Sequence, residues 1–200
     1  IDLAGPVTFT TTRFTVTARP IRAGEAVFLG ADDTTQGDWR GKYGKEGSWL
    51  AGREAKLPAY AKLDLADAPQ WVWKPATNEP RALADSIGQP PAGSRVAACW
   101  YGSPLAFDLD VGDAPHKMTV YVLDWDQNNV RQQRVEIRRM DGEVLDRRDV
   151  GKFQAGRHLT WRLRGHVQVE VQKIRGTNAV ISGIFFDAPD PSRLREAQPP

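Results

Sequence analysis

Short segments in which apolar and polar residues alternate constrain the fold of this chain more than any other feature. In the clearest segment, 167–172, valine occupies every second position and the positions between are Gln or Glu. The same alternation occupies residues 158–163 and, more briefly, 134–138. A period of two is typical of a half-buried β-strand, because successive side chains point to opposite faces of the sheet. These segments predict antiparallel strands with one face in a core and the other in water.

Two further segments, 118–123 and 180–186, are apolar on both faces. Both patterns are typical of the inner strands of a sandwich. Turn-forming Asp-Gly and Gly-His pairs at 141–142 and 165–166 separate the strands, and from residue 95 onward about seven strands follow at the spacing of a sandwich or barrel. We therefore predict an all-β fold, an antiparallel β-sandwich in which long helices are scarce.

The length of the chain, 200 residues, suits one domain, because a chain of this size can bury a core without disulfides or metals. We expect the sandwich to occupy residues 26–187. Residues 1–25 alternate like an added strand or form a linker, and 188–200 form a polar, proline-containing tail. The single cysteine, Cys99, excludes an internal disulfide and predicts a buried small apolar side chain.

Charge limits the classes of partner. The 27 Lys and Arg nearly balance the 25 Asp and Glu, and they are scattered along the chain. This distribution argues against a nucleic-acid partner. No apolar run is long enough for a signal peptide or a membrane span, so we expect no membrane partner either.

The segment 33–44 combines aromatic, hydrogen-bonding and glycine residues in a predicted loop, where the binding groups of a sandwich usually lie. Sugars present apolar C–H faces and hydroxyls, so their sites need aromatic platforms beside planar polar groups. The candidate ligand-binding residues are therefore Gln36, Trp39, Arg40 and Tyr43. The alternative is that the glycines shape turns while the two rings close the end of the core. Exposure of the two rings distinguishes these interpretations.

A second polar constellation follows the predicted strand 118–123 and supplies Asp124, Asp126 and Arg131 as further candidates. Asp124, Asp126 and Asn128 have the every-second-residue spacing of a calcium loop, but the glycine and the bidentate acid of that loop are missing. A turn with side-chain hydrogen bonds is therefore favoured over a structural calcium ion. We expect no cofactor and no metal.

The remaining aromatic pairs have less specific interpretations. Trp71 and Trp73 would share one face of a strand, and we favour core packing over stacking against a sugar. Trp100 and Tyr101 are neighbours whose side chains point to opposite faces, so at most one of them would reach a ligand.

Catalysis leaves little trace in the sequence. His116, His158 and His166 have neither a nearby nucleophile nor metal-ligand spacing, and we interpret all three as surface residues. No cluster of acid, base and arginine groups can be assembled from the sequence, so we expect no enzymatic activity in this chain.

Four blocks of the sequence, 33–44, 97–101, 121–126 and 178–187, resemble the β-sandwich accessory domains of bacterial glycoside hydrolases and other polysaccharide-degrading enzymes. The resemblance covers nearly all of residues 26–187. It implies a jelly-roll or galactose-binding-like sandwich that acts as a non-catalytic carbohydrate-binding module of a secreted, extracellular or periplasmic enzyme. The implied partners are a polysaccharide or oligosaccharide and the catalytic domain of the same parent chain.

Two other functions stay open at this point. The domain could be a structural spacer that docks on a catalytic neighbour and binds no ligand, in which case Trp39 and Tyr43 would be buried. More remotely, it could itself be a jelly-roll lyase or hydrolase.

Overall fold

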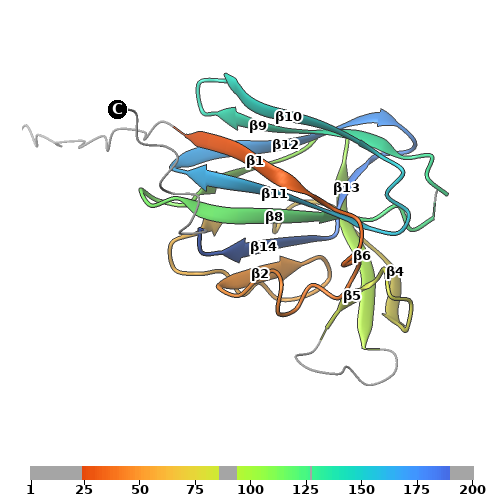
Figure 1. Ribbon diagram of the computed structural model, residues 1–200. Coiled ribbons are helices and arrows are strands. Elements are labelled where there is room, and N and C mark those ends of the chain that lie inside the picture. Colours follow the sequence, from red (N-terminus) through yellow and green to blue (C-terminus); the bar gives the residue numbers. More distant parts are fainter. Residues whose placement is uncertain (1–23, 86–93, 127, 190–200) are drawn as a thin grey trace, which may run out of the picture.

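The computed structural model describes residues 24–85, 94–126 and 128–189 (Figure 1). Within these ranges the regular secondary structure consists of β-strands, with no helix. The strands are β1 (Glu25–Asp32), β2 (Gly47–Leu50), β3 (Lys62–Leu63), β4 (Gln70–Thr77), β5 (Leu83–Ala84), β6 (Arg95–Gly102), β7 (Leu105–Asp110), β8 (His116–Val122), β9 (Gln132–Arg139), β10 (Val144–Gly151), β11 (Arg157–Arg164), β12 (His166–Arg175), β13 (Ala179–Ile181) and β14 (Gly183–Asp187). All described pairings are antiparallel. The predicted all-β antiparallel sandwich is confirmed.

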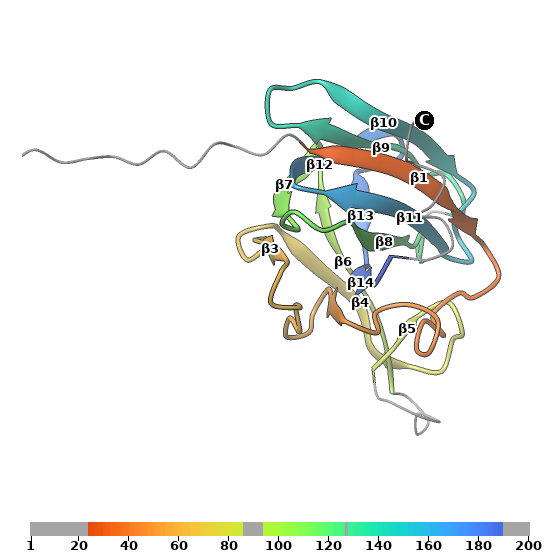
Figure 2. The ribbon, with the colours of Figure 1, turned by 60° about the vertical axis from the view of Figure 1, so that its left-hand side comes forward.

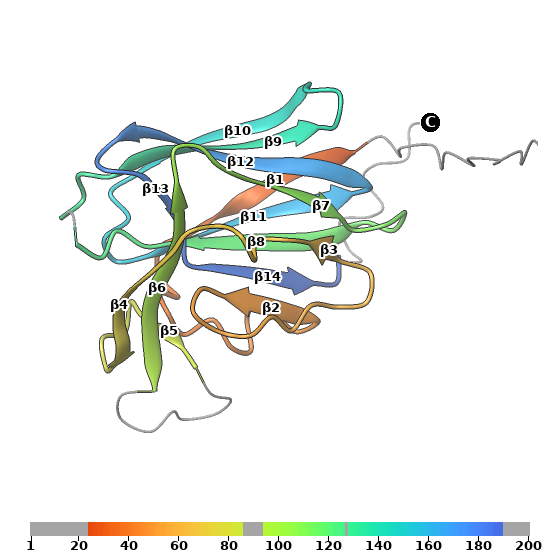
Figure 3. The same ribbon diagram turned by 180° about the vertical axis from the view of Figure 1, so that it is seen from behind.

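The strands form three sheets. The first sheet has the order β1-β11-β8-β14-β2 and the second has the order β10-β9-β12-β7-β3. These two sheets form the layers of the sandwich, and β1 and β10 lie side by side at one edge of it (Figure 2). The third sheet, β13-β6-β4 with β5 beside β6, runs steeply across one end, and β6 leads directly into β7 of the second sheet (Figure 3).

The alternating segments form half-buried strands, as the sequence predicts. In β12, the side chains of Val167, Val169 and Val171 are buried, while the residues between them are partly exposed. Val169 lies opposite Phe107 on β7 and Ile137 on β9, so its side chain is surrounded by apolar neighbours within one sheet face. Burial of such side chains supplies the main driving force for packing the two layers.

The segment 180–186 is fully buried, as predicted for inner strands, and it forms two strands instead of one. It changes sheet at Ser182: β13 pairs with β6 in the third sheet, whereas β14 pairs with β8 and β2 in the first sheet. The Ser182 amide donates a hydrogen bond to the carbonyl oxygen of Tyr121 at this step. The segment is apolar on both faces because it lies where two sheets meet, and all of β13 and β14 is buried.

The first and last strands in the chain lie close to the predicted domain limits, with β1 beginning at Glu25 and β14 ending at Asp187. The expected N-terminal strand or linker lies outside the described residues except for Gly24 and Glu25. The expected tail lies outside them except for Ala188 and Pro189. Cys99 is buried in β6 as expected. The described residues include no helix long and apolar enough to cross a membrane.

Candidate functional site

Trp39 does not offer a stacking platform, contrary to its selection as a ligand-binding candidate. Its side chain is only 6% exposed, its Nε1–H donates a hydrogen bond of 3.0 Å to the carbonyl oxygen of Ala84, and its ring contacts Phe185. Tyr43 is half-buried, stacks on the ring of His158 and donates a hydrogen bond of 2.8 Å to Asp32. Both rings therefore close the end of the core, which is the alternative interpretation of this loop.

The four candidates of this loop are not brought together. Gln36, which has a left-handed φ of 50°, lines one pocket with Pro80 and Gln154. Trp39 and Arg40 line a second pocket, and Tyr43 lines a third. Arg40 lies over the ring of Trp39, 4.5 Å from its centre. The four side chains therefore line three separate pockets and are not gathered in one.

Trp71 is exposed instead of packing in the core as the sequence analysis favours. Its side chain is 57% exposed, and that of Val72 beside it is 43% exposed. The physical reason is the position of β4, which is an edge strand of the third sheet and pairs with β6 on one side only. Pro75 within β4 is typical of such an edge, because proline has no amide hydrogen for a second neighbour. This proline is the signal that could have identified the exposed strand.

A pocket of about 300 Å³ lies beside the rings of Trp71 and Trp73, and we call it the tryptophan pocket. One wall comes from β4 and β6, and the other comes from the connections that follow β8 and β12. Its lining residues are Trp71, Trp73, Cys99, Tyr101, Asp126, Arg131, Thr177 and Asn178. Tyr101 reaches it while its neighbour Trp100 is buried, as their alternation on β6 predicts.

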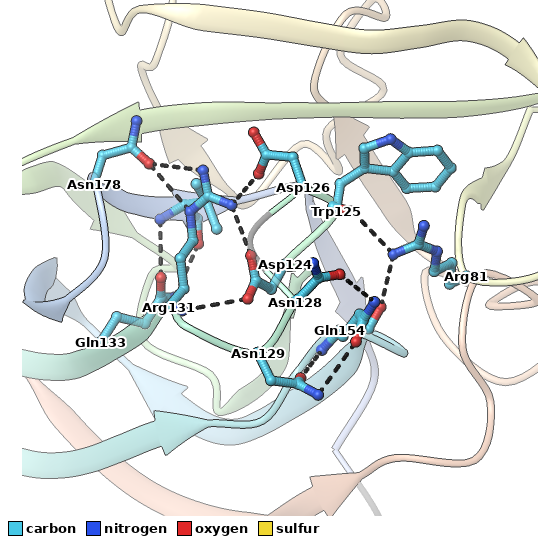
Figure 4. A network of polar contacts seen from close by, with 11 residues as sticks. Arg81, Asp124, Trp125, Asp126, Asn128, Asn129, Arg131, Gln133, Gln154 and Asn178 are labelled. Carbon is cyan, nitrogen blue, oxygen red and sulfur yellow. Dashed lines mark hydrogen bonds and ion pairs between the residues drawn. The ribbon is translucent and has the colours of Figure 1, made fainter.

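The polar wall of the tryptophan pocket is organised around Arg131 (Figure 4). Its side chain is almost fully buried, and its Nη1 donates hydrogen bonds to Asp124 at 2.8 Å and to Asp126. Its Nε and Nη2 both donate to Oδ1 of Asn178 at 3.2 Å. Asp124 also accepts the backbone amide of Arg131. Burial strengthens these charge-assisted bonds, so the wall is rigid.

The predicted candidates Asp124 and Asp126 differ in their exposure to the pocket. Asp124 is fully buried and holds Arg131, so it cannot contact a ligand. Asp126 is 41% exposed and lines the pocket. Partial burial alone would raise the pKa of Asp126, but hydrogen bonds from Arg131 and Trp73 and the charge of Arg131 hold it below its ordinary value of 3.8. Asp126 is thus an ionised hydrogen-bond acceptor at neutral pH.

The aromatic wall is fixed by stacking. The rings of Trp73 and Trp125 lie 6.5 Å apart and nearly parallel. The guanidinium of Arg81 covers the ring of Trp125 at 4.0 Å and donates to its carbonyl oxygen (Figure 4). The guanidinium of Arg131 lies 5.8 Å from the centre of the Trp73 ring. Cations over ring faces are attractive, so Trp73 is held in place before any ligand binds.

His158 is fully buried, so its interpretation as a surface residue is wrong. Although its strand alternates, its side chain points inward, where the rings of Tyr43 and Tyr121 pack against it at 4.4 and 4.5 Å. Burial lowers its pKa to about 4, with a smaller opposing effect of Asp32. His116 and His166 are partly exposed.

Within the described ranges, no group of three or more His, Cys, Asp or Glu side chains is arranged to hold a metal ion. The tryptophan pocket instead combines ring faces with one carboxylate and one amide. Such an arrangement can stack on an apolar face and exchange hydrogen bonds with hydroxyls. In comparisons with known proteins, no family model matches the chain, and no curated protein matches it.

Proposed function

We propose that this protein is a non-catalytic carbohydrate-binding module that holds a polysaccharide or oligosaccharide in the tryptophan pocket. The observation that carries the proposal is the exposed ring of Trp71 at the edge of a pocket that also contains Asp126 and Asn178. When the apolar face of a sugar covers an exposed tryptophan ring, apolar surface is removed from water, and this favours binding. The adjacent polar groups can orient the sugar through its hydroxyls.

The resemblance to accessory domains of polysaccharide-degrading enzymes supports the same function. It extends the proposal to a secreted parent enzyme, extracellular or periplasmic, whose catalytic domain acts on the bound glycan. In this arrangement the module raises the local concentration of substrate near the catalytic domain.

A spacer that docks on a neighbouring domain is the second candidate. The burial of Trp39 and Tyr43 agrees with it, and the exposed apolar side chains of Trp71 and Val72 on β4 could be covered by another protein surface. Trp71 lines the tryptophan pocket and Val72 does not. Carbohydrate binding therefore requires Trp71 but not Val72, whereas docking on a neighbouring domain would use both side chains.

The test is a glycan-array screen of the full chain, followed by titration calorimetry of each hit with Trp71→Ala and Val72→Ala. We expect Trp71→Ala to weaken binding by at least about tenfold, because central aromatic contacts contribute about 2 kcal/mol or more. Val72→Ala should leave the affinity within about twofold. Because both side chains are exposed, neither change should lower the free energy of unfolding by more than about 1 kcal/mol.

Absence of binding to every neutral, acidic and microbial polysaccharide would contradict the proposal and favour the spacer. Binding that survives Trp71→Ala would retain carbohydrate recognition but place it outside the tryptophan pocket. Loss of binding with both variants would indicate a broader contact surface along β4.

A further inference from the structure

We infer that the tryptophan pocket selects uncharged sugars with free neighbouring hydroxyls and disfavours uronic acids and sulfated sugars. This inference rests on the proposed function and concerns the chemical class of the ligand at the same site. It follows from which hydrogen-bonding groups of the polar wall are already occupied and which face the pocket.

Among the described residues that line the pocket, Arg131 is the only arginine, and most of its donors are already used inside the protein. A guanidinium has five N–H donors. Four are used inside the protein: Nη1 donates to Asp124 and Asp126, while Nε and Nη2 donate to Asn178. The side chain is also only 4% exposed. Arg131 therefore has no pair of free donors for the bidentate contact by which arginine binds carboxylates and sulfates.

The charge of the wall also disfavours an anion. Arg131 carries one positive charge, whereas Asp124 and Asp126 carry two negative charges. The carboxylate that reaches the pocket is that of Asp126, and its pKa is lowered, so it stays ionised. A ligand carboxylate beside Asp126 would meet a like charge in a partly desolvated site.

Asn178 supplies the complementary donor. Its Oδ1 accepts both bonds from Arg131, so its Nδ2 amide is directed away from the guanidinium (Figure 4). An amide nitrogen has two N–H donors and no acceptor. Asp126 and Asn178 together thus offer one acceptor and one donor beside the rings of Trp71 and Trp73. Hydroxyls both donate and accept, so a neighbouring pair of them can satisfy both groups.

Lys173 is a cation that contacts a pocket-lining residue, Thr177. Lys173 is exposed, and its Nζ donates a weak hydrogen bond of 3.5 Å to the carbonyl oxygen of Thr177. Water and salt screen such a charge strongly. At low ionic strength Lys173 can attract an anionic polymer to the surface, but it does not line the pocket. Lys173 is therefore a useful control position.

The test measures the affinity of the full chain for three sets of soluble polysaccharides: neutral glucans, galactans, mannans and xylans; polygalacturonate and alginate; and sulfated galactans. We expect the best neutral polymer to bind at least tenfold more tightly than any acidic one at 0.15 M salt. Raising the salt to 0.5 M should change the neutral affinity less than twofold and should abolish residual acidic binding.

Asp126→Asn keeps the shape of the side chain and removes the charge. We expect it to weaken neutral binding at least fivefold and to reduce the preference for neutral over acidic polymers. Lys173→Ala should leave neutral binding within twofold. Thermal unfolding of each variant checks that it is folded, and the salt series on the unaltered protein tests the same inference without any variant.

Tight binding of a uronic or sulfated polymer that Trp71→Ala abolishes would overturn the inference and leave the proposed function intact. Neutral binding that does not depend on Trp71 would overturn the inference because the site would lie elsewhere. If no polysaccharide of any set binds, both the inference and the proposed function are overturned.

Discussion

At the residue scale, the same side chain has opposite roles in different surroundings. Trp39 is in a polar, glycine-containing loop but is buried against Phe185, while Trp71 is in an apolar run but is exposed. His158 shows the same dependence on surroundings. Both of its ring nitrogens are buried and lack a hydrogen-bond partner among the described residues. An unpartnered buried imidazole strongly favours its neutral form.

This burial predicts a pH-dependent stability. The pKa of His158 is about 4 in the folded protein and about 6.5 when exposed, so the unfolded chain binds more protons between these values. The free energy of unfolding should therefore fall as the pH falls from 6.5 to 4, and His158 should contribute about 3 kcal/mol to this loss. We expect His158→Phe to flatten this dependence, with a stability within about 1 kcal/mol of the parent at pH 7.

Urea unfolding at pH 7 and at pH 4.5 measures both proteins under the same conditions. Carboxylates that titrate in this range affect both, so the difference between them isolates His158. An equal loss of stability in the variant and the parent would contradict the prediction.

At the scale of elements, the turn between β10 and β11 packs closely against Tyr121 of the first sheet. Gly156 has a left-handed φ of +87°, and a Cβ at this position would lie 1.6 Å from the Tyr121 hydroxyl oxygen. That hydroxyl donates a hydrogen bond of 2.7 Å to the carbonyl oxygen of Arg81, whose guanidinium covers Trp125. The close approach at Gly156 is thus connected to the aromatic wall through three contacts.

Gly156→Ala should be far more damaging than the matched change in the turn between β9 and β10. Gly142 has a similar φ of +92° but no atom within 4 Å of an added Cβ. Gly142→Ala should cost only the backbone strain, about 1–2 kcal/mol. Gly156→Ala adds a severe clash, so we expect a loss larger by at least about 2 kcal/mol. Thermal or urea unfolding of both variants measures this difference, and equal losses would show that Tyr121 moves without cost.

At the scale of the whole molecule, the Asp126 carboxylate in the tryptophan pocket and the stability of the fold respond to acid over different pH ranges. The pKa of Asp126 is lowered below 3.8, so its carboxylate persists as the pH falls and is lost only below that value. His158, by contrast, opposes folding once the pH falls below about 6.5. The site should therefore keep its acceptor for as long as the domain stays folded.

We accordingly expect the affinity for a bound glycan to stay constant between pH 7 and pH 5. At lower pH, binding should decline together with the folded fraction and not before it. Calorimetric titrations and circular dichroism at matched pH values measure the two quantities. A loss of affinity in fully folded protein above pH 5 would show that a group other than Asp126 controls binding.

The alternating strands and the all-β fold class could be predicted from the sequence, because period-two alternation as in β12 depends only on neighbouring residues. The sequence also determined that Asp126 and Arg131 belong to one polar constellation, since they are close in the chain. Which aromatic rings are exposed depends on how the sheets pack, and this packing also brings Trp71, Tyr101 and Asn178 into one pocket. These residues are far apart in sequence, and their exposure depends on whether another strand covers β4, for which Pro75 is the one local signal.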